Sequence, residues 1–347
     1  SFMIRIAVDV YGGDNAPGCV IDGALEALRA MDDVSILFCG AQAEVEGLLN
    51  GREYDAQRVS IVDAPDIITN HESPTLAIRR KLNSSMVRAM DLVKEGEADA
   101  VVTAGSTGAA LAGGIFRMGR IRGIDRPALG PVLPTSGEHP VILIDCGANA
   151  DCKPDYLVQF ALMGQAYMKG VMGIANPKVG LLNVGAEDEK GNELCKAVFP
   201  LLKDHPGVNF YGNVEARDVL TGVVQVIVCD GFSGNILLKS TEGAAQLIFG
   251  KLKKGLMSSV RSKLGALMVK PALKTVKNEL DYEQYGGAAL LGVKGALVKA
   301  HGSSKGHAYA CAIAQAHTMV KGGVVGIIAQ SLEESGADSD KADQKEE

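Results

Sequence analysis

The sequence contains no tryptophan, and aromatic residues make up only 5% of its 347 residues. It therefore offers few stacking platforms for single-stranded nucleic acid. The formal net charge is −6, and no part of the chain forms a tail rich in lysine and arginine, so nucleic acid is a poor partner for it. Apolar residues make up 47% of the chain. They form no uninterrupted run near the roughly 20 residues that a membrane span needs.

Cofactor and metal motifs are also missing. The seven cysteines are scattered without a CxxC pair, which favours a reducing compartment over a disulfide framework or a structural zinc site. GxGxxG, GxxxxGK[ST] and HExxH are absent, so the motifs for NAD, ATP and a catalytic zinc ion are lacking. We therefore expect no cofactor and no metal. No signal peptide is recognisable, and Ser1 and Phe2 before Met3 are typical of a cloning remnant.

What the sequence has in excess is glycine, with 42 residues that gather after short apolar runs. Each run ends close to an Asp, Asn or Thr and then a glycine-rich turn. In a parallel sheet such turns lie at one edge, where open α/β folds bind their ligands. Glycine lets the backbone approach a ligand, and free N–H groups at helix starts attract anions. The pattern predicts a phosphate-handling enzyme, with turns at residues 6–15, 101–108, 141–149, 181–185 and 226–235.

Strand and helix patterns alternate from Ile4 to about Gln330, which predicts a doubly wound α/β fold and a single catalytic domain over residues 3–330. The predicted strands are 4–10, 34–39, 59–63, 99–103, 141–145, 178–184, 208–211 and 225–229. The predicted helices are 17–31, 42–50, 74–95, 154–170 and one that starts at 106. Residues 331–347 are acidic and almost without apolar side chains, so we expect a disordered tail.

One segment departs from the acidic average, because Gly243 to Lys277 carries eight basic residues and no acidic ones. Its apolar residues recur every three or four positions, which predicts one apolar stripe on a basic helix. Such a helix is typical of a surface for a membrane or an acidic partner, although a core-facing helix with a solvated basic back is the alternative. We assign residues 243–280 to a basic amphipathic helical protrusion. Its surface residues are Phe249, Leu252, Lys253, Lys254, Leu256, Val260, Arg261, Lys263 and Leu264.

Two further features each allow two interpretations. Gly302–Gly306 matches G-x-S-x-G, but a hydrolase needs an acid and then a histidine after the serine, and no acid lies between Ser304 and His317. An anion-binding turn is the better interpretation. Lys190 lies in a very acidic loop, where it is either an ordinary surface lysine or a point charge for phosphate.

Together, these loops resemble those of the PlsX family of bacterial phosphate acyltransferases. The similarity extends from Ile4 to about Ile313 and rests on ten stretches in order. Among them are IAVDVYGGDNAP (6–17), LLNVGAEDEKG (181–191), VCDGFSGNILLK (228–239) and AHGSSKG (300–306). The chain departs from the family pattern at Val10-Tyr11, Ser106, Ala186, Gln225 and Ala289. Ser106 replaces an asparagine but can still donate a hydrogen bond.

The resemblance implies transfer of a fatty acyl group from acyl-[acyl carrier protein] to inorganic phosphate, which gives acyl phosphate for phospholipid synthesis. It implies a three-layer αβα sandwich of the phosphotransacetylase and isocitrate or isopropylmalate dehydrogenase type, assembled as a homodimer. It also implies a cytoplasmic protein that lies peripherally on the inner face of the cell membrane and supplies a glycerol-3-phosphate acyltransferase. The alternatives are a phosphotransacetylase-type enzyme that uses an acyl-coenzyme A thioester and a non-catalytic peripheral membrane protein.

On this reading phosphate is the nucleophile and the thioester is already activated, so the reaction needs no metal, nicotinamide or covalent enzyme intermediate. We predict that Lys190 and Asn235 form the catalytic pair. Lys190 would neutralise phosphate, and Asn235 would hold the oxyanion or aim the acyl carbonyl. Phosphate and substrate contacts are assigned to Asp9, Gly12, Gly13, Asp14, Asn15, Ser106, Thr107, Asn149, Asp230, Ser233, His301, Ser303 and Ser304. An acidic carrier protein would dock on Arg79, Arg80, Lys81, Arg117, Arg120, Arg122 and Arg126.

Overall fold

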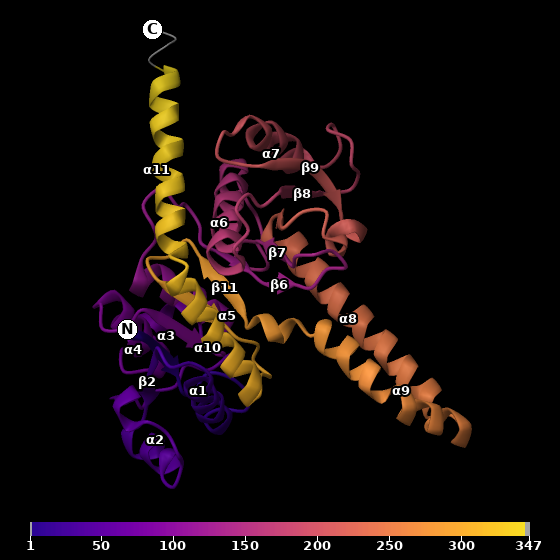
Figure 1. The fold of residues 1–347 in the computed structure, drawn as a ribbon. Coiled ribbons are helices and arrows are strands. Elements are labelled where there is room, and N and C mark those ends of the chain that lie inside the picture. The colour runs from indigo at the N-terminus through magenta and orange to yellow at the C-terminus, as the bar shows by residue number, and fades with distance from the viewer. Residues whose placement is uncertain (1, 344–347) are drawn as a thin grey trace.

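The computed structural model describes residues 2–343, with the side chains of residue 282 and residues 337–343 left out of the description (Figure 1). Within these residues the strands form two sheets. The first, in spatial order, consists of β3 (Val59–Asp63), β2 (Val34–Gly40), β1 (Ile4–Asp9), β4 (Ala100–Thr103), β12 (Ala296–Lys299), β11 (Ala288–Leu291) and β5 (Ala128–Gly130). The second consists of β6 (Val132–Leu133), β7 (Val141–Ile144), β10 (Val226–Val228), β8 (Val179–Asn183) and β9 (Phe210–Glu215).

Each sheet has a parallel centre and an antiparallel margin. In the first sheet β1, β2, β3, β4 and β12 run parallel, whereas β11 is antiparallel to both of its neighbours. In the second sheet β7, β8, β9 and β10 run parallel, and β6 pairs antiparallel with β7. The expectation that all glycine-rich turns share one sheet edge is therefore wrong. They lie at the carboxyl ends of parallel strands, but these strands belong to two different sheets.

Helices cover both faces of the first sheet, as the alternation of side chains along a strand requires. Ile6 and Val8 of β1 belong to the core that includes α1 (Gly18–Ala30) and α10 (Gly306–Lys321). Ala7 points to the opposite face, against α4 (Ser85–Lys94) and α5 (Thr107–Gly113).

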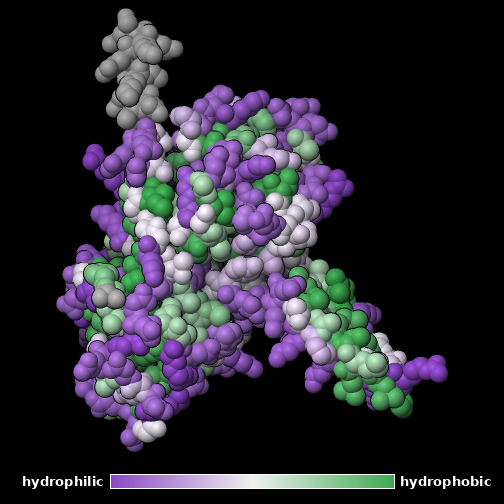
Figure 2. All heavy atoms as spheres, viewed as in Figure 1, coloured by the Kyte–Doolittle hydropathy of each residue, from purple (hydrophilic) through white to green (hydrophobic). Residues whose placement is uncertain are grey.

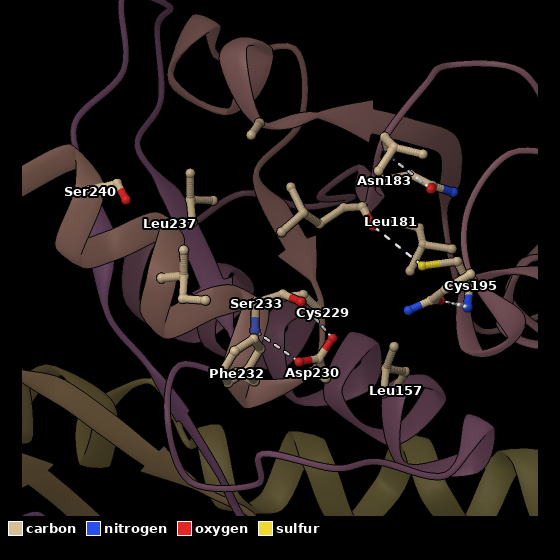
Figure 3. Close-up of a pocket in the computed structure, with 15 residues that line it drawn as sticks. Leu157, Leu181, Asn183, Cys195, Cys229, Asp230, Phe232, Ser233, Leu237 and Ser240 are labelled. Atoms are coloured by element: carbon tan, nitrogen blue, oxygen red, sulfur yellow. Dashed lines mark hydrogen bonds between the residues drawn. The ribbon is translucent and has the colours of Figure 1, made fainter.

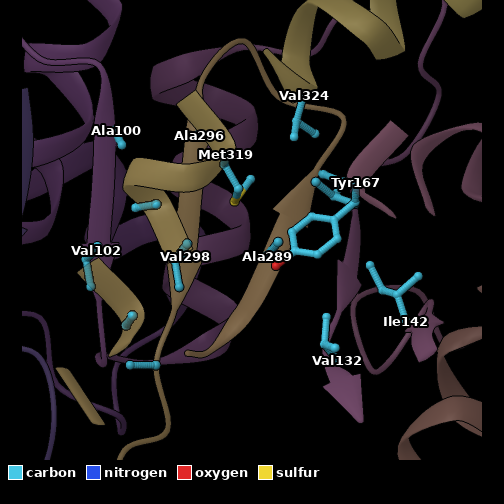
Figure 4. Packing of buried hydrophobic residues seen from close by; sticks show 14 of the residues in the cluster. Ala100, Val102, Val132, Ile142, Tyr167, Ala289, Ala296, Val298, Met319 and Val324 are labelled. Atoms are coloured by element: carbon cyan, nitrogen blue, oxygen red, sulfur yellow. The ribbon is translucent and has the colours of Figure 1, made fainter. Parts of the chain in front are cut away.

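One hydrophobic core extends from the first sheet to the second. Tyr167 of α6 (Pro154–Met172) is fully buried, and its ring lies between Ala289 of β11 and Ile142 of β7 (Figure 4). Met319 of α10 and Val324 of α11 (Val324–Asp343) pack in the same cluster (Figure 4). Because this packing joins both sheets, the loops at their carboxyl edges are held in a fixed relation.

Most of the predicted elements are confirmed, and three regions differ. The single helix expected over 74–95 is wrong, because the chain forms α3 (Pro74–Arg80) and then α4, with Ser84 accepting a hydrogen bond of 3.3 Å from Val87 N as the cap of α4. Several elements had no counterpart among the predicted ranges. They are the strands β5, β6, β11 and β12, the helices α7 (Glu193–Asp204) and α10, and the first turns of α8 (Gly231–Leu256).

The acidic tail is the third difference. It was expected to be disordered, but α11 continues through the described residues to Asp343, while residues 344–347 lie outside them. Ser331 and Ser335 each donate a side-chain hydrogen bond to the carbonyl one turn earlier. A low apolar content indicates that a segment is not buried, but it does not exclude a helix. Glutamate and lysine are good helix formers even when exposed.

The basic segment forms a helical hairpin of α8 and α9 (Val260–Glu279) that projects away from the sheets (Figure 1). The chain reverses at Met257–Ser259, and Ser259 caps α9 by accepting a hydrogen bond of 3.0 Å from Ser262 N. The predicted single stripe is therefore divided between two helices. Phe249, Leu252 and Leu256 of α8 line a groove against α9, whereas Val260 and Leu264 are exposed. Apolar side chains are prominent on the hairpin surface (Figure 2).

Among the described residues no single helix is long and apolar enough to cross a membrane. The bent pair of Gly306–Lys321 and Val324–Gly336 reaches that length and composition together. Much of Gly306–Lys321 is buried against the first sheet, and core packing accounts for its apolar composition.

Candidate active site

The predicted phosphate loops meet at the carboxyl edge of the first sheet. We call this group the first cluster: Asp9, Gly12, Gly13, Asp14, Asn15, Ser106, Thr107, Lys299, His301, Ser303 and Ser304. Its loops follow β1, β4 and β12, which are adjacent in the sheet. They approach so closely at Gly12 that an added Cβ would lie 2.8 Å from Gly105 N. Gly13 has a φ of +105°, which side chains rarely adopt. Both glycines are therefore required by the backbone.

Asp9 organises the floor of this cluster. Its carboxyl group is 2% exposed and accepts hydrogen bonds from Ser85 Oγ at 2.5 Å and from Thr103 Oγ1 at 2.6 Å. Burial raises the pKa of this carboxyl group, while the two hydroxyl donors act in the opposite direction. Because hydroxyl groups of two other segments donate to the Asp9 oxygens, this carboxyl group orders the surrounding loops.

Lys299 is a member of the cluster that our sequence reasoning missed. It ends β12, is half-buried, and donates from Nζ to Ala300 O at 2.5 Å. Burial lowers its pKa to about 8, although the nearby carboxylates of Asp9 and Asp14 oppose the shift. The sequence signal was a lysine that ends the apolar run 296–298 and lies two residues before His301.

The loop after β12 is tied to the loop after β1. Asn15 Nδ2 donates to Ser303 O at 3.1 Å and to Ser304 O at 3.3 Å, and Asp14 N donates to Gly302 O at 2.8 Å. The Tyr309 hydroxyl group donates a hydrogen bond to Gly12 O. Ser304 is 2% exposed, so its burial suits support of the loop better than contact with a ligand.

Several polar side chains of the first cluster are more accessible, and Asp14, Asn15 and Ser303 are among the exposed ones. His301 is exposed, and its Nδ1 lies 2.7 Å from Ser303 Oγ and 3.3 Å from Ser303 N. Ser106 is half-buried and caps α5 by accepting from Ala109 N at 3.3 Å. Thr107, which follows it, is exposed.

The other predicted residues gather at the carboxyl edge of the second sheet. We call this group the second cluster: Asn149, Lys190, Asp230, Ser233 and Asn235. They follow β7, β8 and β10, and β10 pairs with both of the other two strands. The structure thus separates the predicted site residues into two groups, one for each sheet.

Lys190 and Asn235, the predicted catalytic pair, are both exposed. The Lys190 carbonyl accepts a hydrogen bond of 3.0 Å from Asn183 Nδ2, and its stem lies against Gly185, where a Cβ would be 3.0 Å from Lys190 Cγ. Asn235 lies in the first turns of α8 beside Gly147, where a Cβ would be 3.7 Å from Asn235 Oδ1. Both loops are therefore fixed, while the two polar ends face solvent.

Asp230 and Ser233 hold the start of α8. The Asp230 carboxylate accepts from Ser233 N and from Ser233 Oγ, both at 2.8 Å, so Asp230 is the N-cap of the helix (Figure 3). This arrangement positions Asn235, which lies one half-turn beyond Ser233 on the same helix.

Asp145 and Asn149 connect the two sheets. The fully buried Asp145 accepts hydrogen bonds from Leu129 N of β5 at 2.9 Å and from Asn149 N at 2.6 Å. The Asn149 amide donates to Pro127 O at 2.8 Å and back to Asp145 at 3.0 Å. Burial raises the pKa of Asp145, and these donors oppose the shift. Both amide hydrogens of Asn149 have partners, so this residue positions the second cluster beside the first sheet.

Within the described residues, no group of three or more His, Cys, Asp or Glu side chains could hold a metal ion. The cations of the two clusters are Lys299 and Lys190. Together with loop amides, hydroxyls and carboxamides, they form a surface suited to an oxyanion substrate.

Comparison with solved structures places the fold in the phosphotransacetylase-like class. The EutD phosphotransacetylase from Staphylococcus aureus aligns with a TM-score of 0.58 at 17% identity, over 95% of this chain and 94% of that one. A branched-chain phosphotransacylase from Enterococcus faecalis V583 aligns with a TM-score of 0.55 at 14% identity, over 92% and 99%. At these identities the likeness concerns the fold alone.

Sequence comparison identifies the family. A family model described as a fatty acid synthesis protein matches residues 4–326. The phosphate acyltransferase of Clostridium acetobutylicum is 50% identical over 329 residues, which cover 95% of this chain and 99% of the relative. That of Bacillus cereus is 49% identical over 330 residues, which cover 95% and 98%. The chain belongs to this fatty acid synthesis protein family, the PlsX family of phosphate acyltransferases.

Proposed function

We propose that this protein is a phosphate acyltransferase that moves a fatty acyl group from acyl-[acyl carrier protein] to inorganic phosphate. The observation that carries the proposal is family membership over nearly the whole chain, together with two anion-suited loop clusters, the second of which is bonded to the edge of the first sheet through Asp145 and Asn149. The product, acyl phosphate, would serve a glycerol-3-phosphate acyltransferase in phospholipid synthesis.

The reaction requires one bond to form and one to break. A phosphate oxygen attacks the carbonyl carbon of the thioester, and the carbon–sulfur bond then breaks with its electron pair passing to sulfur. The protein must aim phosphate, stabilise the tetrahedral oxyanion and assist the leaving thiolate. Positioning alone supplies roughly 7–11 kcal/mol in well-oriented reactions.

The two clusters divide these tasks. The first cluster binds phosphate through the backbone at Gly12 and Gly13 and through the side chains of Asn15, Thr107 and His301. Lys299 adds a positive charge at its floor. In the second cluster Lys190 neutralises the entering phosphate and Asn235 donates to the oxyanion, a contribution that is typically about 2.7–4 kcal/mol.

An acidic carrier protein would dock on the exposed basic face around Phe116. Arg79 lies over the Phe116 ring at 4.9 Å, and this ring is itself 48% exposed. A cavity beside it is lined by Phe116, Arg120 and Arg122. Two of the predicted docking residues are already paired, Arg117 with Asp91 and Lys81 with Glu72. The available charge is therefore that of Arg79, Arg80, Arg120, Arg122 and Arg126.

The α8–α9 hairpin is our candidate for peripheral attachment to the cytoplasmic face of the cell membrane. Val260 is 75% and Leu264 61% exposed, beside the exposed cations Lys263 and Arg261. Flotation with anionic vesicles tests this. Val260→Glu should abolish flotation, whereas Ser258→Glu adds the same charge two residues away and should keep most of it. Equal flotation of both variants and the unchanged protein would contradict the attachment.

We also infer a homodimer and a three-layer αβα sandwich, both supported by the family resemblance and by the phosphotransacetylase-like fold. The alternative enzyme is a phosphotransacetylase that uses acyl-coenzyme A, which the names of the structural neighbours favour. A non-catalytic membrane protein on the same fold is the remaining alternative.

One assay separates these functions. Purified protein is mixed with acyl-[acyl carrier protein] and phosphate, and acyl phosphate is trapped with hydroxylamine as a hydroxamate. We expect phosphate-dependent hydroxamate, with a KM for the carrier that rises with salt because its docking is electrostatic. Equal turnover of acyl-coenzyme A at the same low concentration would favour the phosphotransacetylase. Absence of hydroxamate with either thioester would contradict both enzymes.

A further inference from the structure

The second cluster borders a cavity of about 440 Å³, and its members Asp230 and Ser233 line that cavity. It lies between α8 on one side and the ends of β8 and α7 on the other (Figure 3). Its volume is within the range of about 300–1,000 Å³ that is typical of sites enclosing a small ligand. Its walls are largely apolar, with Leu157, Leu181, Cys195, Phe232 and Leu237 among the lining residues.

Three polar residues of the wall, Asn183, Asp230 and Ser233, are engaged by their own loops. Asn183 donates from Nδ2 to Asn213 Oδ1 at 2.9 Å and to Lys190 O at 3.0 Å, and its Oδ1 accepts from Val184 N at 2.8 Å. Asp230 is engaged by Ser233. A largely apolar wall whose Asn183 and Asp230 side chains are already engaged offers little to a hydrogen-bonding ligand such as a nucleotide, and it suits a hydrocarbon.

The position of the cavity relates it to the chemistry. Asn183 of its wall holds the backbone of Lys190, and Ile236 of its wall follows Asn235 directly. Asn235 itself belongs to α8, next in sequence to this wall residue, and does not line the cavity. The cavity therefore adjoins the loop that carries Lys190 and the helix that carries Asn235.

We propose that this cavity binds the acyl chain of the substrate, as a linear hydrocarbon whose thioester carbonyl lies at the mouth between Lys190 and Asn235. The inference rests on the proposed function and adds the place where the chain is held. Ile236 of the wall is 48% exposed, so the cavity is accessible beside α8. Burial of each methylene group should strengthen binding about fourfold until the cavity is full.

The first test compares chain lengths. Ser240 lines the cavity from an exposed position on α8, so Ser240→Trp narrows it with little risk to folding. We expect this variant to lower kcat/KM at least tenfold for a 16-carbon acyl-[acyl carrier protein] and to stay within twofold of the unchanged protein for a 6-carbon one. Gln246→Trp is the matched control, because Gln246 is exposed on the same helix and does not line the cavity. Equal effects of Ser240→Trp on both chain lengths would overturn the assignment.

The second test needs neither a variant nor turnover. Cys195 lines the cavity and is half-buried, whereas Cys311 is half-buried on α10 away from it. Saturating palmitate should slow the alkylation of Cys195 by N-ethylmaleimide at least tenfold, measured by peptide mass spectrometry, and leave Cys311 unchanged. Unprotected Cys195 at saturating palmitate would refute the acyl site. Failure of the hydroxylamine assay with a protected Cys195 would refute the proposed reaction and keep the hydrocarbon site.

Discussion

The two loop clusters hold their lysines in opposite ways. In the first, Asp9 and Lys299 are buried or half-buried and bonded to strand neighbours, and Asn15 ties two loops together. In the second, Lys190 and Asn235 are exposed. The difference suggests that the first cluster is a preformed cradle for phosphate, whereas the second supplies groups that act on the reacting atoms. Substitutions should then change stability and phosphate binding in one cluster and turnover in the other.

The largest expected effect is on turnover, in the second cluster. Asn235→Ala and Lys190→Met should each lower kcat about 100- to 1,000-fold, because each removes a group that stabilises developing charge. Since both side chains are exposed, the free energy of unfolding should change by no more than about 0.5 kcal/mol. Saturating kinetics and thermal melts measure the two quantities. Near wild-type kcat in both variants would break the assignment.

The second effect is on stability, in the first cluster. Asp9→Ala leaves the hydroxyls of Ser85 and Thr103 without their acceptor in a buried site, which should cost about 3–5 kcal/mol of unfolding free energy. Asp14→Ala is the matched control in the same loop, and because Asp14 is exposed it should cost about 0.5 kcal/mol or less. Denaturant unfolding measures both. Equal small losses of unfolding free energy in both variants would mean that the exposed and the buried carboxyl groups contribute alike to stability.

Lys299→Met tests the role of the half-buried cation in the first cluster, both in phosphate binding and in the pH dependence of stability. Removing the cation should raise the KM for phosphate about tenfold, which corresponds to about 1.4 kcal/mol. The folded pKa of about 8 lies below the ordinary value of 10.5, so between these pH values the unfolded protein binds more protons at Lys299 than the folded protein does.

The stability of the unchanged protein relative to Lys299→Met should therefore rise as the pH increases from about 8 to 10.5, by roughly 3 kcal/mol at most. Unfolding of both proteins at pH 7 and at pH 10 measures the difference. A stability difference that is constant with pH would show that Lys299 titrates as a solvated lysine.

The members of both clusters could largely be predicted from the sequence, because turn chemistry is local. A turn can be recognised in the sequence within a few residues of a strand end, as at Gly12, Gly13 and the helix cap Asp230. The division of the turns between two sheets could not be predicted. It depends on the pairing of β5, β6 and β11, which are strands of two to four residues without a readable period.

Lys299 and the hydrocarbon cavity were missed for related reasons. A lysine at the end of an apolar run is ordinary in sequence, and only its placement beside Asp9 and Asp14 gives it significance. The cavity walls come from α6, β8, α7 and α8, which are far apart along the chain. Long-range packing of this kind leaves no local pattern.

The smallest expected effect separates binding from support within the first cluster. Asn15→Ala removes two hydrogen bonds to the loop after β12, at an exposed position where each contributes about 0.5 kcal/mol. The KM for phosphate should rise severalfold with kcat unchanged. Asn15→Asp keeps the shape but cannot donate and adds a negative charge, so its KM should rise further, and more at low salt than at high salt. If the two variants share one KM at every salt concentration, Asn15 supports the loop and does not face the bound phosphate.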